Sequence, residues 1–197
     1  WANLPGSSAT VAIYQAARTA NGPILLITHD TPSALKLEQE LLHFSPNELP
    51  VCLFPDWETL PYDTFSPHQD IISQRLSTLY QLSRMNKGIV VVPISTLLHK
   101  LSPKSYLEAN SLMVKKGDKK DLHQLRQSLE ANGYRNVDQV MEHGEFSARG
   151  AILDLYPMGS EAPFRLDFFD DEIDEIRIFD PESQRSLDKI DKIALLP

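Results

Sequence analysis

The sequence predicts an α/β protein in which a parallel-sheet domain is followed by a smaller α+β domain with antiparallel strands. Up to about residue 108, short apolar runs alternate with segments of helical periodicity, which is typical of a parallel sheet with helical crossovers. Beyond that point, β-rich runs broken by turn residues predominate. We therefore expect two domains, at residues 1–108 and 109–197.

The elements of the first domain follow from hydrophobic periodicity. Three segments have apolar residues at helical spacing and are predicted to form amphipathic helices: 8–20, 31–44 and 70–85. Three apolar runs are predicted to form strands: 23–28, 51–54 and 88–93. The first and last of these runs have the uninterrupted apolar character of parallel strands that are buried on both faces. Between 54 and 70 we expect a structured loop with Trp57, Tyr62 and Phe65 packed against the sheet.

The second domain is predicted to contain one helix among several strands. The helix covers residues 121–133, where Asn132-Gly133 provides a stop signal. Strand-like runs are expected within four segments: 111–117, 150–158, 164–180 and 192–197.

Composition restricts the possible functions. The chain has 197 residues, of which 42% are hydrophobic, and a formal net charge of −8. Such a surface does not attract nucleic acid as a whole, because neutralising phosphates needs clustered Lys and Arg. The single cysteine, Cys52, excludes an internal disulfide and suits a reducing cytosol. No apolar run has the length of a membrane span and no signal peptide is recognisable, so we expect a cytoplasmic protein without a membrane partner.

The stretch Gly6-Ser7-Ser8-Ala9-Thr10 has the outline of a phosphate-binding loop that opens a helix. A working loop reads G-x-x-x-x-G-K-[ST], with a lysine that reaches the β- and γ-phosphates. Here Ser8 stands at the second glycine, Ala9 at the lysine, and only Thr10 fits the closing position. We expect a degenerate loop that neither binds nor hydrolyses ATP, so that this chain contains no bound cofactor.

The best candidate site is the strand pattern FRLDFF at 164–169. Period-2 alternation places Arg165 and Phe169 on one face of the strand, opposite a plausible core face. Arg149 precedes Gly150, which could form a bulge that brings Arg149 alongside. An exposed arginine and aromatic ring together have the composition of an interaction hot spot. The alternative is that both arginines pair with acids across the sheet, namely Asp154, Asp167 or Asp170, and that Phe169 belongs to the core.

No catalytic or metal-binding constellation is recognisable. The acidic run 170–175 is better explained by a turn between two strands, because Asp-Asp suits a turn and alternating acids would face water. The six histidines show no ligand spacing. We therefore predict no catalytic residue and no metal ligand.

Two long stretches are specific enough to suggest a family: WETLPYDTFSPHQDIISQRLSTLYQL at 57–82 and DQVMEHGEFSARGAILDLYPMGSEAPFRLDFFDDEIDEIRIFDPESQRS at 138–186. Both resemble the N-terminal module of bacterial transcription-repair coupling factors. That module is itself similar to the N-terminal domains of UvrB, the damage-verification subunit of excision repair. The resemblance implies a helicase-like domain 1a with a degenerate phosphate loop, followed by domain 2, and a chain that is the front of a longer protein.

The resemblance also implies a function and partners. In the family, domain 2 binds UvrA through arginines and a phenylalanine at the positions of Arg149, Arg165 and Phe169. The full-length proteins use ATP and Mg²⁺ in motor domains that are absent here, translocate on double-stranded DNA and displace stalled RNA polymerase. The alternatives are the front of a UvrB-like helicase subunit that binds damaged DNA, a divergent ATP-dependent helicase domain, and a structural domain that packs against the motor.

Overall fold

The computed structural model describes residues 4–45, 48–59 and 63–197, and the chain divides into two compact units. The first unit comprises the described residues of 1–67 together with 78–101, and the second comprises 68–77 with 102–197. Helix α3 (Gln69–Leu82) therefore contributes its first part to the second unit and its last turn to the first. The domain boundary expected at residue 108 stays a prediction.

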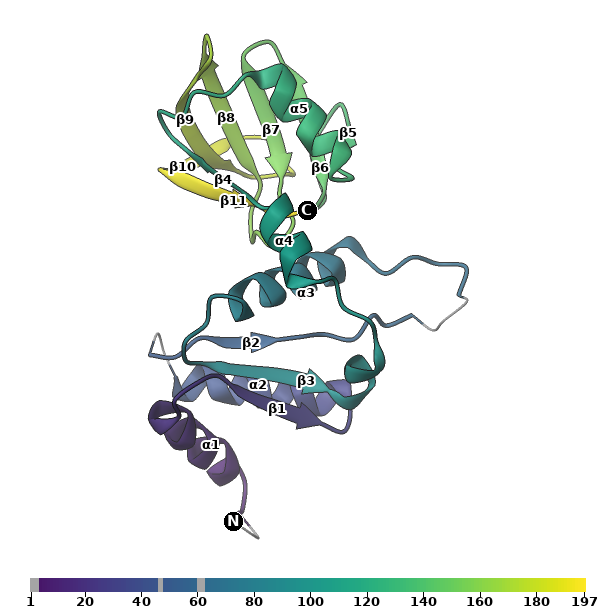
Figure 1. The fold of residues 1–197 in the computed structure, drawn as a ribbon, viewed down its shortest axis with the longest axis vertical. Helices are drawn as coiled ribbons and strands as arrows, with labels where there is room; N and C mark the ends of the chain where they lie inside the picture. Colours follow the sequence, from purple (N-terminus) through teal and green to yellow (C-terminus); the bar gives the residue numbers. More distant parts are fainter. Residues whose placement is uncertain (1–3, 46–47, 60–62) are drawn as a thin grey trace. The chain divides into compact units, whose positions relative to one another are not determined.

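The first unit is built on a parallel sheet with the strand order β1-β3-β2. Its elements are α1 (Ser8–Thr19), β1 (Ile24–Thr28), α2 (Thr31–Phe44), β2 (Val51–Leu53), β3 (Ile89–Pro93) and the 3₁₀ helix η1 (Ile94–Leu98). Helices α1 and α2 lie on one face of the sheet, and the end of α3 that belongs to this unit lies on the other (Figure 1). Ile89 and Val91 of the central strand pack with α1 and α2, while Val90 and Val92 pack beneath Leu79 of α3. The predicted mixed α/β architecture is confirmed.

Strand β1 differs from the expectation of a strand buried on both faces. It pairs with β3 in parallel, as predicted, but it lies at the edge of the sheet. Ile24 and Leu26 pack against the helices, whereas Leu25 and Ile27 are 52% and 54% exposed. An edge strand has only one neighbour, and at these two residues its second face is left about half exposed. A uniformly apolar run cannot distinguish this position from a central one.

The loop after β2 also departs from expectation. Phe65 is 79% exposed, so it does not pack against the sheet. Trp57 is half-buried, and Tyr62 lies outside the described residues. Phe65 is followed by Ser66 and Pro67 and precedes helix α3.

The second unit contains a six-stranded sheet with the order β10-β9-β8-β7-β6-β5 and a separate two-stranded sheet β11-β4. The strands are β4 (Leu112–Lys115), β5 (Arg135–Asn136), β6 (Glu145–Arg149), β7 (Ile152–Tyr156), β8 (Phe164–Phe169), β9 (Glu172–Phe179), β10 (Ser186–Ile190) and β11 (Lys192–Leu195). The helices are α4 (Lys104–Asn110) and α5 (Leu122–Ala131). All neighbouring pairs in the larger sheet are antiparallel except β5 and β6.

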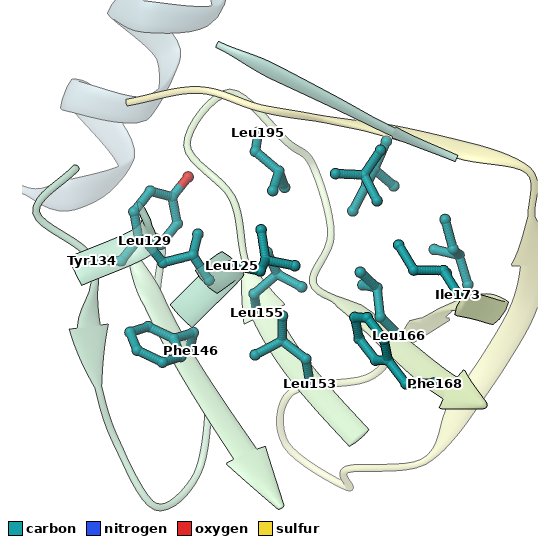
Figure 2. Packing of buried hydrophobic residues seen from close by; sticks show 13 residues of the cluster. Leu125, Leu129, Tyr134, Phe146, Leu153, Leu155, Leu166, Phe168, Ile173 and Leu195 are labelled. Carbon is teal, nitrogen blue, oxygen red and sulfur yellow. The ribbon is translucent and has the colours of Figure 1, made fainter. Parts of the chain in front are cut away.

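One apolar core fills the space between the two sheets and α5 of the second unit (Figure 2). Leu153, Leu155 and Leu166 point into it from the middle of the large sheet and are fully buried. Leu125 and Leu129, one helical turn apart, come from α5. Burying a leucine side chain contributes about 1.5–3 kcal/mol, so the inward face of this sheet is a main source of the unit's stability. The alternate residues of β7 and β8 are left for the opposite face.

Tyr134 closes one end of this core. Its hydroxyl donates a hydrogen bond to the carbonyl of Leu196 at 2.7 Å and accepts one from the backbone N–H of Met158 at 3.0 Å. The residue is 5% exposed, and burial raises the pKa of the phenol from 10.0 to about 12.

We predict that Tyr134→Phe destabilises the second unit by about 1–3 kcal/mol at neutral pH, because two buried backbone groups lose their partner. Between pH 10 and pH 12, the free energy of unfolding of the parent should fall by a further ~3 kcal/mol. In that range the phenol ionises in the unfolded chain while it stays protonated in the folded one. The variant should lack this alkaline loss. Urea unfolding followed by circular dichroism at each pH measures both effects. Identical alkaline profiles for the two proteins would show that Tyr134 is not the group responsible.

Candidate functional site

The outward face of the six-stranded sheet carries a row of polar side chains that are in register across four strands. Ser147 pairs with Asp154, Asp154 with Arg165, and Arg165 with Arg177. Because side chains alternate between the faces of a strand, these residues lie opposite the apolar core. The alternation predicted for 164–169 is confirmed: Leu166 and Phe168 are buried in the core, and Arg165 faces outward.

Asp154 stands at the centre of this row and binds two arginines. Its side chain is 1% exposed. Oδ1 accepts a hydrogen bond from Nε of Arg165 at 2.6 Å, and Oδ2 accepts one from Nη2 of Arg165 at 2.9 Å. Oδ2 also accepts from Nη2 of Arg149 at 2.8 Å. The structure therefore brings Arg149 and Arg165 together through a shared carboxylate, one of the three partners that the sequence left open.

The guanidinium of Arg165 is held on all its edges. In addition to Asp154, its Nη1 donates to the carbonyl of Gln184 at 3.3 Å and to Oγ of Ser186 at 3.2 Å. Its Cζ lies 5.0 Å from the ring centroid of Phe179, within the range of a cation–π contact. The pKa of Arg165 is raised, mainly by its hydrogen bonds to the Asp154 carboxylate. Only 15% of the side chain is exposed.

Arg149 is far more open than Arg165. It is the last residue of β6, and its side chain is 58% exposed with one hydrogen bond, to Asp154. The expected bulge at Gly150 is wrong, because Arg149 pairs directly with Ile152 and Gly150-Ala151 form a two-residue hairpin turn. Gly150 has φ +60° and Ala151 has no positive φ, as in a type II′ turn, which favours glycine at its first position.

Phe169 projects from the end of β8 and is 80% exposed, so it does not belong to the core. It pairs with Glu172 across the turn Asp170-Asp171, and Asp170 adopts φ +57°. Aspartate tolerates this left-handed conformation better than most residues. The prediction of a turn between two strands is thus confirmed for this part of the acidic run.

The same face carries a further ion-pair network, which the sequence analysis did not predict. Arg177 forms ion pairs with Asp167 and Glu175, and Lys189 also pairs with Glu175. The contacts of Arg165 to Gln184 and Ser186 were missed. Gln184 has φ +59°, and no local sequence signal indicates that conformation for a glutamine.

The stretch at residues 6–10, predicted from the sequence to be a degenerate phosphate loop, lies at the start of helix α1 in the first unit. Gly6 has φ +54°, and α1 begins at Ser8. The hydroxyl of Thr10, 2% exposed, donates to Oε2 of Glu40 at 2.5 Å. Glu40 lines the same hollow of about 530 Å³ as Gly6, Ala9 and Lys36. A carboxylate thus lies where an intact loop would present its hydroxyl to a metal–phosphate group.

The described residues also bear on three other possibilities: a cysteine nucleophile, a metal site and a membrane-spanning helix. Cys52 is buried, its Sγ donates to Oε1 of Gln81 at 3.2 Å, and burial raises the pKa of its thiol, all of which disfavour a nucleophile. Among the residues that the structure describes, no group of three or more His, Cys, Asp or Glu side chains could hold a metal ion. None of the described helices is long and apolar enough to cross a membrane.

The two arginines should differ in their contribution to stability. Arg165→Ala leaves the buried Asp154 carboxylate with one partner and should cost about 3–5 kcal/mol of unfolding free energy. Arg149→Ala removes an exposed partner and should cost less than about 1 kcal/mol. Hydrogen exchange of the β7 and β8 amides measures both. Equal losses would show that Arg165 is not the main partner of Asp154.

Known proteins match this chain over nearly its whole length. Residues 112–197 match the UvrB interaction domain family. The chain is 56% identical to the transcription-repair-coupling factor of Haemophilus influenzae and 52% identical to that of Escherichia coli, each over 98% of its length. It is 33% identical to that of Bacillus subtilis over 100% of its length, and it spans 17% of each relative. The chain therefore belongs to the bacterial transcription-repair-coupling factor family, as a homologue of its N-terminal region.

Proposed function

We propose that this chain is the recruitment module of a transcription-repair-coupling factor and that its second unit binds UvrA, the damage-sensing ATPase subunit of excision repair. The observation that carries the proposal is the exposed ring of Phe169 on the same sheet face as the Arg149–Asp154–Arg165 cluster, in a unit that matches a UvrB interaction domain. An aromatic ring and arginines on a strand face form a suitable hot spot for a protein partner.

The remaining activities of the longer protein belong outside this chain. RNA polymerase and double-stranded DNA would be bound by other domains, where ATP and Mg²⁺ would drive a translocase. The small share of each relative that the chain spans supports this division. The relatives are bacterial, and we place the function in the bacterial cytoplasm.

The alternative is a UvrB-like subunit that binds damaged DNA. The high identity to coupling factors favours the recruitment function instead. The formal net charge of −8 also disfavours a DNA-binding surface. Salt-sensitive binding of DNA by this chain would favour the alternative.

The first unit is proposed to be a relic of a nucleotide-binding domain. Ala9 removes the charge that would face the phosphates, and the Glu40 carboxylate bonded to Thr10 would repel them.

The chain should therefore show no ATP turnover above the background of its Thr10→Ala variant, because both proteins have Ala9 where a working loop has its phosphate-binding lysine. A coupled phosphate-release assay with Mg²⁺ measures the turnover. Hydrolysis that disappears in the variant would contradict the assignment of a relic.

Phe169→Ala should weaken binding to purified UvrA by about thirtyfold, which corresponds to ~2 kcal/mol for a lost hot-spot aromatic. Titration calorimetry measures the affinity. Because the side chain is 80% exposed, the variant should keep its fold.

The matched control is Phe65→Ala, which removes an equally exposed phenylalanine (79%) from the first unit. This control should bind UvrA as the parent does. If both variants bind like the parent, the surface is wrongly assigned. If the parent itself does not bind UvrA, the recruitment function fails for this chain.

A further inference from the structure

The Asp154 cluster is arranged unequally around its carboxylate. Arg165 uses Nε and Nη2 on Asp154 and Nη1 on Ser186 and Gln184, so its donors are directed inward. Arg149 has one bond to the same carboxylate, while more than half of its side chain is exposed. Two positive charges and one negative charge leave this cluster with a formal charge of +1.

This arrangement orders a side chain that would otherwise be mobile. An exposed arginine at the end of a hairpin strand loses much rotamer freedom when a partner immobilises it, which weakens binding. The bond from Arg149 Nη2 to Asp154 fixes one edge of the guanidinium in advance. In the described part of the chain the other edge has no hydrogen-bond partner, and a guanidinium edge matches the two oxygens of a carboxylate.

We propose that Asp154 is a positioning residue of the partner-binding surface: it orders Arg149, together with Arg165, so that the open edge of Arg149 receives an acidic side chain of the partner. Asp154 itself, 1% exposed, does not touch the partner. The inference rests on the proposed binding of UvrA. It adds that Asp154 prepares the binding surface and that Arg149 binds a carboxylate of the partner.

The test is a double-variant cycle on the full 197-residue chain, titrated with UvrA. Asp154→Asn and Arg149→Ala should each weaken binding by about tenfold, as expected from lost preorganisation and a lost charged contact. Combined, they should weaken binding clearly less than the product of the two factors, because Asp154 acts through Arg149. Fully multiplicative losses would overturn the inference, as would an Asp154→Asn variant that binds like the parent.

A matched control separates positioning from general destabilisation. Glu145 lies on β6, the strand that ends at Arg149, and its side chain is 10% exposed. It accepts a hydrogen bond at 3.1 Å from Arg135, whose side chain is 57% exposed. Glu145→Gln therefore removes a similarly buried carboxylate that holds an exposed arginine at the far end of the strand. It should bind UvrA within about twofold of the parent, since effects of well-separated sites are independent. A loss equal to that of Asp154→Asn would mean that stability alone is being measured, and it would overturn the inference.

A second readout does not depend on the partner. The Nε–H of Arg165, bonded to Asp154 at 2.6 Å, should give a protected side-chain NMR signal in the free parent and lose it in Asp154→Asn. An unprotected Nε–H signal in the parent would overturn the inference, whether or not UvrA binds. If the signal is protected but the parent does not bind UvrA, the proposed function fails instead.

If Asp154→Asn does not fold, Ser186→Ala replaces it. This variant removes the hydroxyl that accepts from Arg165 Nη1 at 3.2 Å and leaves the carboxylate in place. It should weaken binding by about threefold, because one hydrogen bond that orders the cluster is lost. Unchanged binding would overturn the inference.

Discussion

A carboxylate buried in the middle of a sheet imposes the strictest condition on this structure. Asp154 is fully covered, and a charge in that position is tolerated only when it is paired and hydrogen-bonded. Three N–H donors from two arginines meet this condition. They can do so only if β6, β7 and β8 keep the register that places residues 147, 154 and 165 in one row. The ion cluster therefore specifies the alignment of the strands as well as the chemistry of their outer face.

The two faces of this sheet depend on each other. A shift of β8 by one residue would turn Leu166 outward and Arg165 into the core. The cost of burying an unpaired guanidinium would add to the loss of apolar burial, so the native register is strongly preferred. Phe169, at the end of the same strand, inherits its position from this alignment. An exposed aromatic residue thus owes its orientation in part to Leu166, which is fully buried and out of a partner's reach.

Local patterns predicted most of the secondary structure, because helical spacing in α1, α2, α3 and α5 and alternation in β8 are properties of neighbouring residues. The sequence also restricted the partners of the two arginines to three acids. It could not select Asp154, since strand register decides which acid faces which arginine. It could not place β1 at an edge, because strand order is absent from an apolar run. Gln184 and Ser186 bond Arg165 from just before the edge strand β10 and from its first residue, 19 and 21 residues further along the chain.

Helix α3 belongs to both units, and this has a consequence for how the chain can be divided. Ser73 accepts a hydrogen bond from the backbone N–H of Gly159 at 2.8 Å, and Asp70 bonds His143 at 2.8 Å. Both contacts hold residues 68–77 within the second unit, although the segment 78–101 that follows returns to the first. No single cleavage of the backbone separates two complete units. A shortened protein that begins after residue 101 would lack part of its own packing, so gene fusion or transfer of the interaction surface has to carry the preceding helix with it.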